Sequence, residues 1–83
     1  MVLILLIAQT CYIIYMVNYP KLLKETRNTL LISQSDLARE LGVSFATVNR
    51  WENSQHEPSL SAKRKIRDFC KKHKIDTAPF QMN

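Results

Sequence analysis

One stretch, from Gln34 to Asn53, constrains the fold of this chain more than any other part of its sequence. Gly42, the only glycine, divides it into two short segments. Residues expected to face inward recur at helical spacing on both sides of this glycine. They are Leu37, Ala38, Leu41, Thr47, Val48 and Trp51. A glycine just after a helical pattern supplies the left-handed conformation that ends one helix and turns the chain. The stretch therefore predicts two short helices joined by a tight turn.

Two short helices joined by a glycine-containing turn form a helix-turn-helix, whose second helix can enter the major groove of DNA. The second predicted helix turns four side chains away from its inner face, namely Phe45, Ala46, Asn49 and Arg50. Trp51 lies on the inner face, and we expect it in the core rather than at a ligand site. The four outward side chains are therefore the first candidates for contacts with a partner.

The motif and its flanks match one known pattern in several short segments. These are Ser33-Gln34, Leu37-Ala38, Leu41-Gly42-Val43-Ser44, Thr47-Val48, Arg50-Trp51-Glu52-Asn53 and Pro58-Ser59. In these segments the chain resembles the Cro/phage-repressor (Xre-type) helix-turn-helix family, and the resemblance extends over about Tyr19 to Ile75. It implies an all-α, lambda-repressor-like domain of about four to five helices. It also implies a small, repressor-like transcriptional regulator that binds specific sequences in double-stranded DNA.

The resemblance assigns roles to individual positions. Residues that would contact base edges are Ser44, Phe45, Ala46 and Arg50, with Asn49 beside them. A guanidinium can donate two hydrogen bonds to guanine O6 and N7, so Arg50 is the best candidate for direct readout, with a plain phosphate contact as its alternative. Phe45 and Ala46 suit apolar contact with a thymine methyl group, although Phe45 could instead pack against protein. Gln34 and Asn53 match phosphate-binding positions.

The same resemblance pairs Arg27 with Glu52. In the family an arginine and a glutamate at these positions form a largely buried ion pair. Two charges near a small core are tolerated only together, and breaking such a pair costs about 3–5 kcal/mol. The alternative is that both are solvated surface charges.

Local signals outside the motif predict the remaining helix ends. Pro20 suits the first turn of a helix that runs to about Leu30. Leu31 and Ile32 follow it, and we expect both to fold back onto the core. Ser33 is a predicted N-cap, with Asp36 completing a capping box.

A last helix is predicted from Leu60 to about His73, with Ser59 as its N-cap. Its inward stripe is Ala62, Ile66, Phe69 and Cys70. Residues 63–74 hold seven of the twelve Lys and Arg residues. Lys63 and Arg64, near the helix start, are candidates for phosphate contacts, while the alternative is an ordinary solvated face. The tail, residues 76–83, is too short to form a further stable helix.

Residues 1–17 contain no charged side chain, and we separate residues 1–18 from the domain at 19–75. Three interpretations stay open: a membrane anchor, an apolar arm that covers the domain or a dimer partner, and an over-extended start in which the natural chain begins at Met16. As a helix the segment would be about 28 Å long, close to a bilayer core. Basic residues beside a spanning segment stay on the cytoplasmic side of the membrane, and Lys21 is the first cation after this segment. A spanning helix would therefore leave the DNA-binding part on the cytoplasmic side of the inner membrane.

Composition limits the remaining alternatives. The 83 residues allow one small domain, and the net charge of +5 favours a polyanionic partner. Cys11 and Cys70 show no metal spacing and are expected as free thiols in a reducing cytoplasm. We expect no metal, no cofactor, no small-molecule effector and no catalytic residues, and we expect a homodimer if the target is palindromic. The competing hypothesis is a protein-interaction module, either antitoxin-like or a membrane-tethered adaptor with the same fold.

Overall fold

A computed structural model describes residues 17–80 of the chain. The described part contains four α-helices, α2 (Tyr19–Leu30), α3 (Gln34–Leu41), α4 (Phe45–Glu52) and α5 (Leu60–Lys72), and a short 3-10 helix η1 (Ala78–Phe80). The predicted all-α fold is confirmed. The hypotheses about the N-terminal segment fall on residues outside the described range. Among residues 17–80, no helix combines the length and the apolar character needed to cross a membrane.

The helices begin where capping side chains precede them. Ser33 Oγ accepts a hydrogen bond from the backbone N–H of Asp36, and the Asp36 carboxylate accepts one from the backbone N–H of Ser33. Ser59 Oγ caps α5 by accepting a hydrogen bond from the backbone N–H of Ala62. Asn18 Oδ1 caps α2 by accepting one from the backbone N–H of Lys21, with proline in the first turn. Each cap satisfies backbone donors that have no partner within the helix. The predicted N-caps Ser33 and Ser59 are confirmed, whereas the Asn18 cap was not predicted.

Two left-handed residues end α2 and α3. Gly42 ends α3 with φ of 69°, as predicted. Leu31 ends α2 with φ of 57° and ψ of 46°, and its side chain is 89% exposed. The expectation that Leu31 folds back onto the core is therefore wrong. The left-handed backbone turns this side chain outward, and only its neighbour Ile32 packs against the core.

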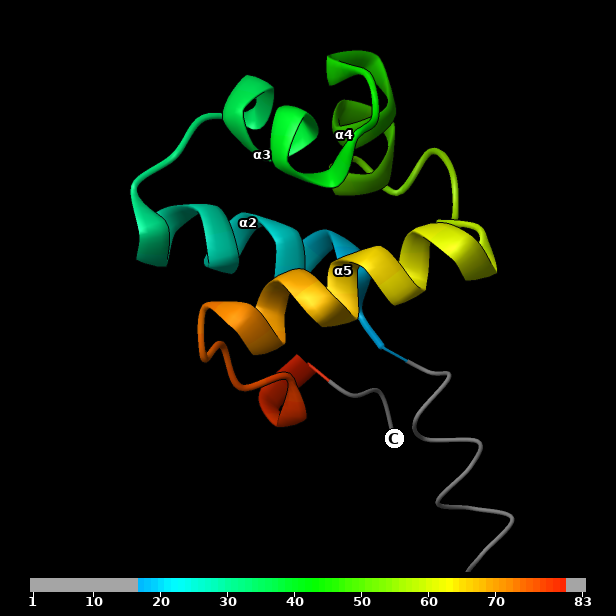
Figure 1. The fold of residues 1–83 in the computed structure, drawn as a ribbon. Helices are drawn as coiled ribbons and strands as arrows, with labels where there is room; N and C mark the ends of the chain where they lie inside the picture. The colour runs from blue at the N-terminus through cyan, green and yellow to red at the C-terminus, as the bar shows by residue number, and fades with distance from the viewer. Residues whose placement is uncertain (1–16, 81–83) are drawn as a thin grey trace, which may run out of the picture.

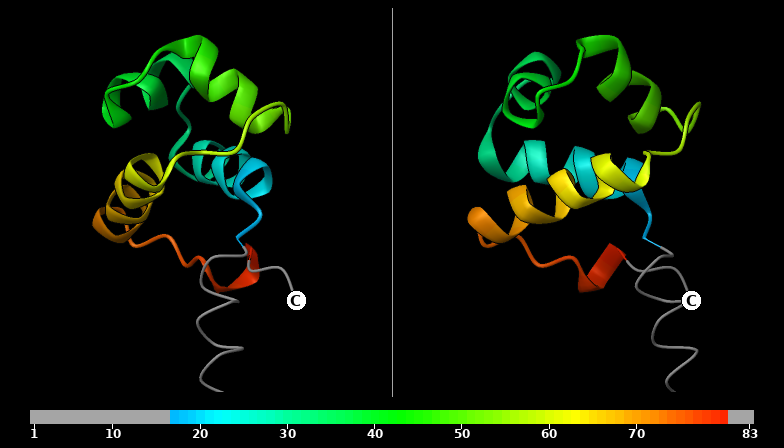
Figure 2. Two further views of the ribbon diagram at one scale, coloured as in Figure 1. Left: turned by 90° about the vertical axis from the view of Figure 1, so that its right-hand side faces the viewer. Right: turned by 45° about the vertical axis from the view of Figure 1, so that its right-hand side comes forward.

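The helices form two layers around one core (Figure 1). The helix-turn-helix pair α3 and α4 lies over α2 and α5, and the same arrangement appears in both views of Figure 2. Buried side chains from all four helices meet between the layers: Leu22, Leu23, Leu37, Leu41, Val48, Trp51, Ile66, Phe69 and Cys70. The tail adds the 3-10 turn η1, which packs against α2 while the Phe80 carbonyl accepts a hydrogen bond from Asn18 at 2.7 Å. This packing leaves one side of α4 facing outward.

Candidate nucleic-acid interface

The outward side of α4 carries the side chains that the sequence singles out. Val48, Trp51 and Glu52 are buried, whereas Ala46 and Arg50 are exposed and Phe45 is 52% exposed. Within residues 17–80, no carboxylate forms an ion pair with Arg50. The helix therefore presents a cation and two apolar groups to solvent, and none of the three is buried in the core.

Ser44 caps this helix. Its Oγ accepts a hydrogen bond from the backbone N–H of Thr47 at 3.1 Å and lies 2.8 Å from Thr47 Oγ1. An N-cap residue has an extended backbone, here φ of −79° and ψ of 156°, which turns the chain sharply into the helix. Ser44 is exposed at the start of α4, but its side chain is engaged in the cap.

Below α4, Arg27 and Glu52 lie together in a bidentate ion pair. Arg27 Nε and Nη2 each donate to a different carboxylate oxygen of Glu52, both at 2.7 Å. The Glu52 side chain is 1% exposed and that of Arg27 is 20% exposed. The hydrogen bond to Glu52 raises the pKa of Arg27 above its ordinary value. Arg27 also donates to the Ile32 carbonyl at 3.4 Å, so this pair joins α2, α4 and the chain between α2 and α3.

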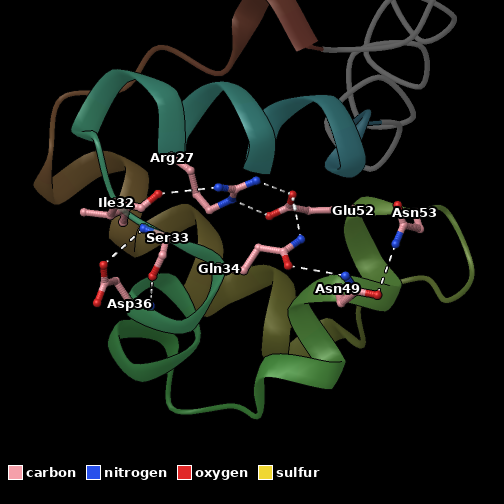
Figure 3. A network of polar contacts seen from close by, with 8 residues as sticks. All are labelled: Arg27, Ile32, Ser33, Gln34, Asp36, Asn49, Glu52 and Asn53. Carbon is pink, nitrogen blue, oxygen red and sulfur yellow. Dashed lines mark hydrogen bonds and ion pairs between the residues drawn. The ribbon is translucent and has the colours of Figure 1, made fainter.

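A chain of amide side chains continues from this ion pair to the surface (Figure 3). Gln34 Nε2 donates to Glu52 Oε1 at 3.2 Å, and Asn49 Nδ2 donates to Gln34 Oε1 at 3.3 Å. Asn53 Nδ2 then donates to Asn49 Oδ1 at 3.1 Å. An ionised carboxylate can only accept, so Glu52 sets the direction of every amide in the chain. Asn49 thus connects the two residues predicted to bind phosphate.

Sequence analysis missed this chain of amides. Asn49 and Asn53 stand four positions apart on one helix, a spacing at which side chains meet, so that contact could have been anticipated. The contact of Asn49 with Gln34 depends on how α3 packs against α4, and periodicity does not report that.

The two cations proposed at the start of α5 are placed differently from each other. Lys63 Nζ lies 3.2 Å from Glu57 Oε1 and 5.5 Å from the centre of the Tyr19 ring. These contacts direct Lys63 toward the first turn of α2. Arg64 is exposed on α5. Lys65, another cation of α5, lines a surface depression together with Arg50 of α4. The sequence analysis did not single out Lys65.

The described residues include no cluster of His, Cys, Asp or Glu side chains able to hold a metal ion. Cys70 is buried beside α2, and this burial raises the pKa of its thiol. Tyr19 is also buried, and the pKa of its phenol is raised for the same reason.

Comparison with protein families gives one match. The model of the helix-turn-helix family HTH_3, of Cro type and Xre-like, matches residues 23–73, which is more than half of the chain. The match includes most of α2 and all of α3, α4 and α5. No curated protein and no solved structure matches the chain significantly.

Proposed function

Because the chain belongs to the Cro-type, Xre-like helix-turn-helix family, whose domain is a DNA-binding one typical of transcription regulators, we propose that it is a repressor-like regulator that binds specific double-stranded DNA sequences. In this proposal α4 lies in the major groove with Ser44, Phe45, Ala46 and Arg50 toward the base edges. A homodimer on two half-sites about one helical turn apart is part of the proposal.

The observation that carries the proposal is the exposed row on α4. Arg50 is free of carboxylate partners within the described residues, so its guanidinium can donate to guanine O6 and N7 without breaking an ion pair. Such a bidentate contact discriminates against other bases by about 1–3 kcal/mol. Phe45 and Ala46 offer no hydrogen bond, and their exposure suits them to thymine methyl groups.

The amide chain supports a separate role for Asn49. Its side chain donates to Gln34 and accepts from Asn53, so it lies between the two residues predicted to bind phosphate. We assign Asn49 to positioning these two residues rather than to an independent base contact. Each amide NH2 carries two hydrogens, so Gln34 and Asn53 would bind phosphates with the one that the amide chain leaves free. Phosphate contacts of this kind set the register of the helix in the groove.

Selection from a randomised pool of DNA duplexes with the full chain tests the proposal. We expect an enriched motif, and we expect Arg50→Ala to relax one base position of that motif with a loss of about 1–3 kcal/mol. The matched control is Arg67→Ala, which removes the same side chain from an exposed position on α5 where it contacts Asp68. This control should leave the motif unchanged.

Two results would count against the proposal. One is weak binding without a motif that disappears with added salt and is indifferent to Arg50→Ala. That behaviour would indicate the competing function, a protein-interaction module with an ordinary basic surface. The other is an equal effect of Arg50→Ala and Arg67→Ala, because loss of net charge alone would then explain the change.

A further inference from the structure

The outer side of α5 carries a row of cations that the proposed function does not use. Four exposed side chains form this α5 basic face: Arg64, Arg67, Lys71 and Lys72. We infer that the α5 basic face lies on a bilayer surface of anionic lipid, while the outward row of α4 stays uncovered. This inference goes beyond the proposed function and does not depend on it, since binding to lipid is measured without DNA.

Helical spacing places the four cations on one side of α5. Positions three, four, seven or eight residues apart share one side of an α-helix. Arg67, Lys71 and Lys72 follow Arg64 at three, seven and eight positions. The buried side chains of α5 form the opposite side, and they are Ala62, Ile66, Phe69 and Cys70. The α5 basic face therefore points into solvent and covers no part of the core.

Two contacts mark the edges of the α5 basic face. Lys63 Nζ lies 5.5 Å from the centre of the Tyr19 ring, so Lys63 turns toward α2. Lys65 lines the depression that it shares with Arg50, so Lys65 turns toward α4. Arg64 stands between these two lysines in the sequence, and it points away from both neighbouring helices.

The charge of the α5 basic face is positive and weakly opposed. Asp68 is the one acidic residue of α5, and it contacts Arg67 at 3.3 Å. Within residues 17–80, no carboxylate forms an ion pair with Arg64, Lys71 or Lys72. Four cations against one carboxylate leave this face with a net charge of 4 − 1 = +3. A cluster of about four to eight Lys or Arg residues on a helix is typical of a site for anionic lipid.

The place where the chain enters the domain favours a bilayer over other polyanions. The backbone N–H of Asn18 donates to the Phe80 carbonyl at 2.7 Å, and both residues lie on the side of α2 and α5 away from α3 and α4 (Figures 1 and 2). Residues 1–17, which precede this point, are mostly apolar and carry no charge. An apolar segment beside a basic face provides the two attractions that binding to a bilayer surface combines. The apolar segment would add nothing to electrostatic attraction for a nucleic acid.

The two layers of the fold separate this surface from the outward row of α4. That row belongs to the other layer and also faces away from the core. A bilayer against the α5 basic face therefore leaves Phe45, Ala46 and Arg50 uncovered. The same molecule can then hold lipid on one side and DNA on the other.

The test is flotation of the full chain with lipid vesicles, either of phosphatidylcholine alone or of equal parts phosphatidylcholine and phosphatidylglycerol. We expect binding to the anionic vesicles that weakens with added salt. The double variant Arg64→Gln with Lys71→Gln should weaken this binding about 30-fold, because each cation near the surface contributes a factor of about five. The matched control is Arg39→Gln with Lys65→Gln, which removes the same two residue types from outside the face and should cause a much smaller loss. Fluorescence of the buried Trp51 verifies that every variant is folded.

Equal losses for the two double variants would overturn the inference, because net charge alone would then explain the binding. Equal binding to neutral and anionic vesicles would also overturn it, since the apolar segment would suffice. If neither kind of vesicle is bound, but the α5 double variant alone weakens binding to a DNA duplex without the selected motif, the face belongs to nucleic acid and not to lipid. Absence of an enriched DNA motif would instead reject the proposed function, and vesicle binding would be unaffected by that result.

Discussion

Replacing Arg27 by methionine removes the charge that faces Glu52 but keeps most of the apolar stem of the side chain. The Glu52 carboxylate is 1% exposed, and after the change it retains a single side-chain donor, Gln34 Nε2 at 3.2 Å. The complementary change, Glu52→Gln, leaves a guanidinium that is 20% exposed, still donates to the Ile32 carbonyl and can reach water. Loss of the partner should therefore cost more when Glu52 is left unpaired than when Arg27 is, because the Glu52 carboxylate is shielded from solvent.

We expect Arg27→Met to destabilise the fold by about 3–5 kcal/mol, the cost of leaving a buried charge unpaired. Glu52→Gln should cost less, about 1–3 kcal/mol, since its amide oxygen can still accept from Arg27. A chain of 83 residues has a total stability of about 4–12 kcal/mol, so the first change removes a large part of it. The melting temperature of Arg27→Met should fall by about 12 °C or more.

Urea unfolding followed by the fluorescence of Trp51 measures both costs, because this single tryptophan is buried in the core. The double variant Arg27→Met with Glu52→Leu is the control for lost packing. It removes both charges, and apolar replacement of a buried pair is often nearly neutral, so it should be more stable than Arg27→Met alone. The reasoning is refuted if Arg27→Met costs under about 1 kcal/mol, or if the double variant is the less stable of the two.

Two further predictions concern backbone conformation and pH. Leu31→Gly should stabilise the fold by roughly 0.5–1 kcal/mol in thermal or urea unfolding, because an exposed leucine holds a left-handed backbone that glycine adopts without strain. Gly42→Ala should lower the free energy of unfolding by roughly 1 kcal/mol. The cost comes from the left-handed backbone alone, since an added Cβ meets no atom within 4 Å. A change of the same sign in both variants would contradict this reasoning. Hydrogen bonds from Ser33 lower the pKa of Asp36 below its ordinary value of 3.8. The stability that ionised Asp36 contributes is therefore fully present above the pKa of the unfolded chain. It is lost as the pH falls through the lower pKa of the folded protein. The difference in unfolding free energy between the wild type and Asp36→Asn should therefore shrink in acid, and a difference independent of pH would contradict the capping role.

Features governed by neighbouring residues could be predicted from the sequence. The capping box of Ser33 and Asp36, the left-handed turn at Gly42 and the inward stripe of α5 depend on contacts within a few positions along the chain. The outward row of α4 follows from the same periodicity, because Val48 and Trp51 fix which side is buried. These local rules, together with the family pattern, were enough to predict the fold and the side of α4 that faces outward.

Apart from the Arg27–Glu52 ion pair, which the family resemblance implied, the features that join separate helices were decided only by the tertiary structure. Periodicity places Gln34 and Asn49 on their own helices, but the packing of α3 against α4 brings them within 3.3 Å and makes Asn49 a link in the amide chain. The same holds for α5, where the helix directs Lys63 to Tyr19 and Glu57 and brings Lys65 to the depression beside Arg50. A side chain whose partner lies outside its own helix leaves no periodic trace in the sequence, because such a contact depends on the distances and angles between packed elements.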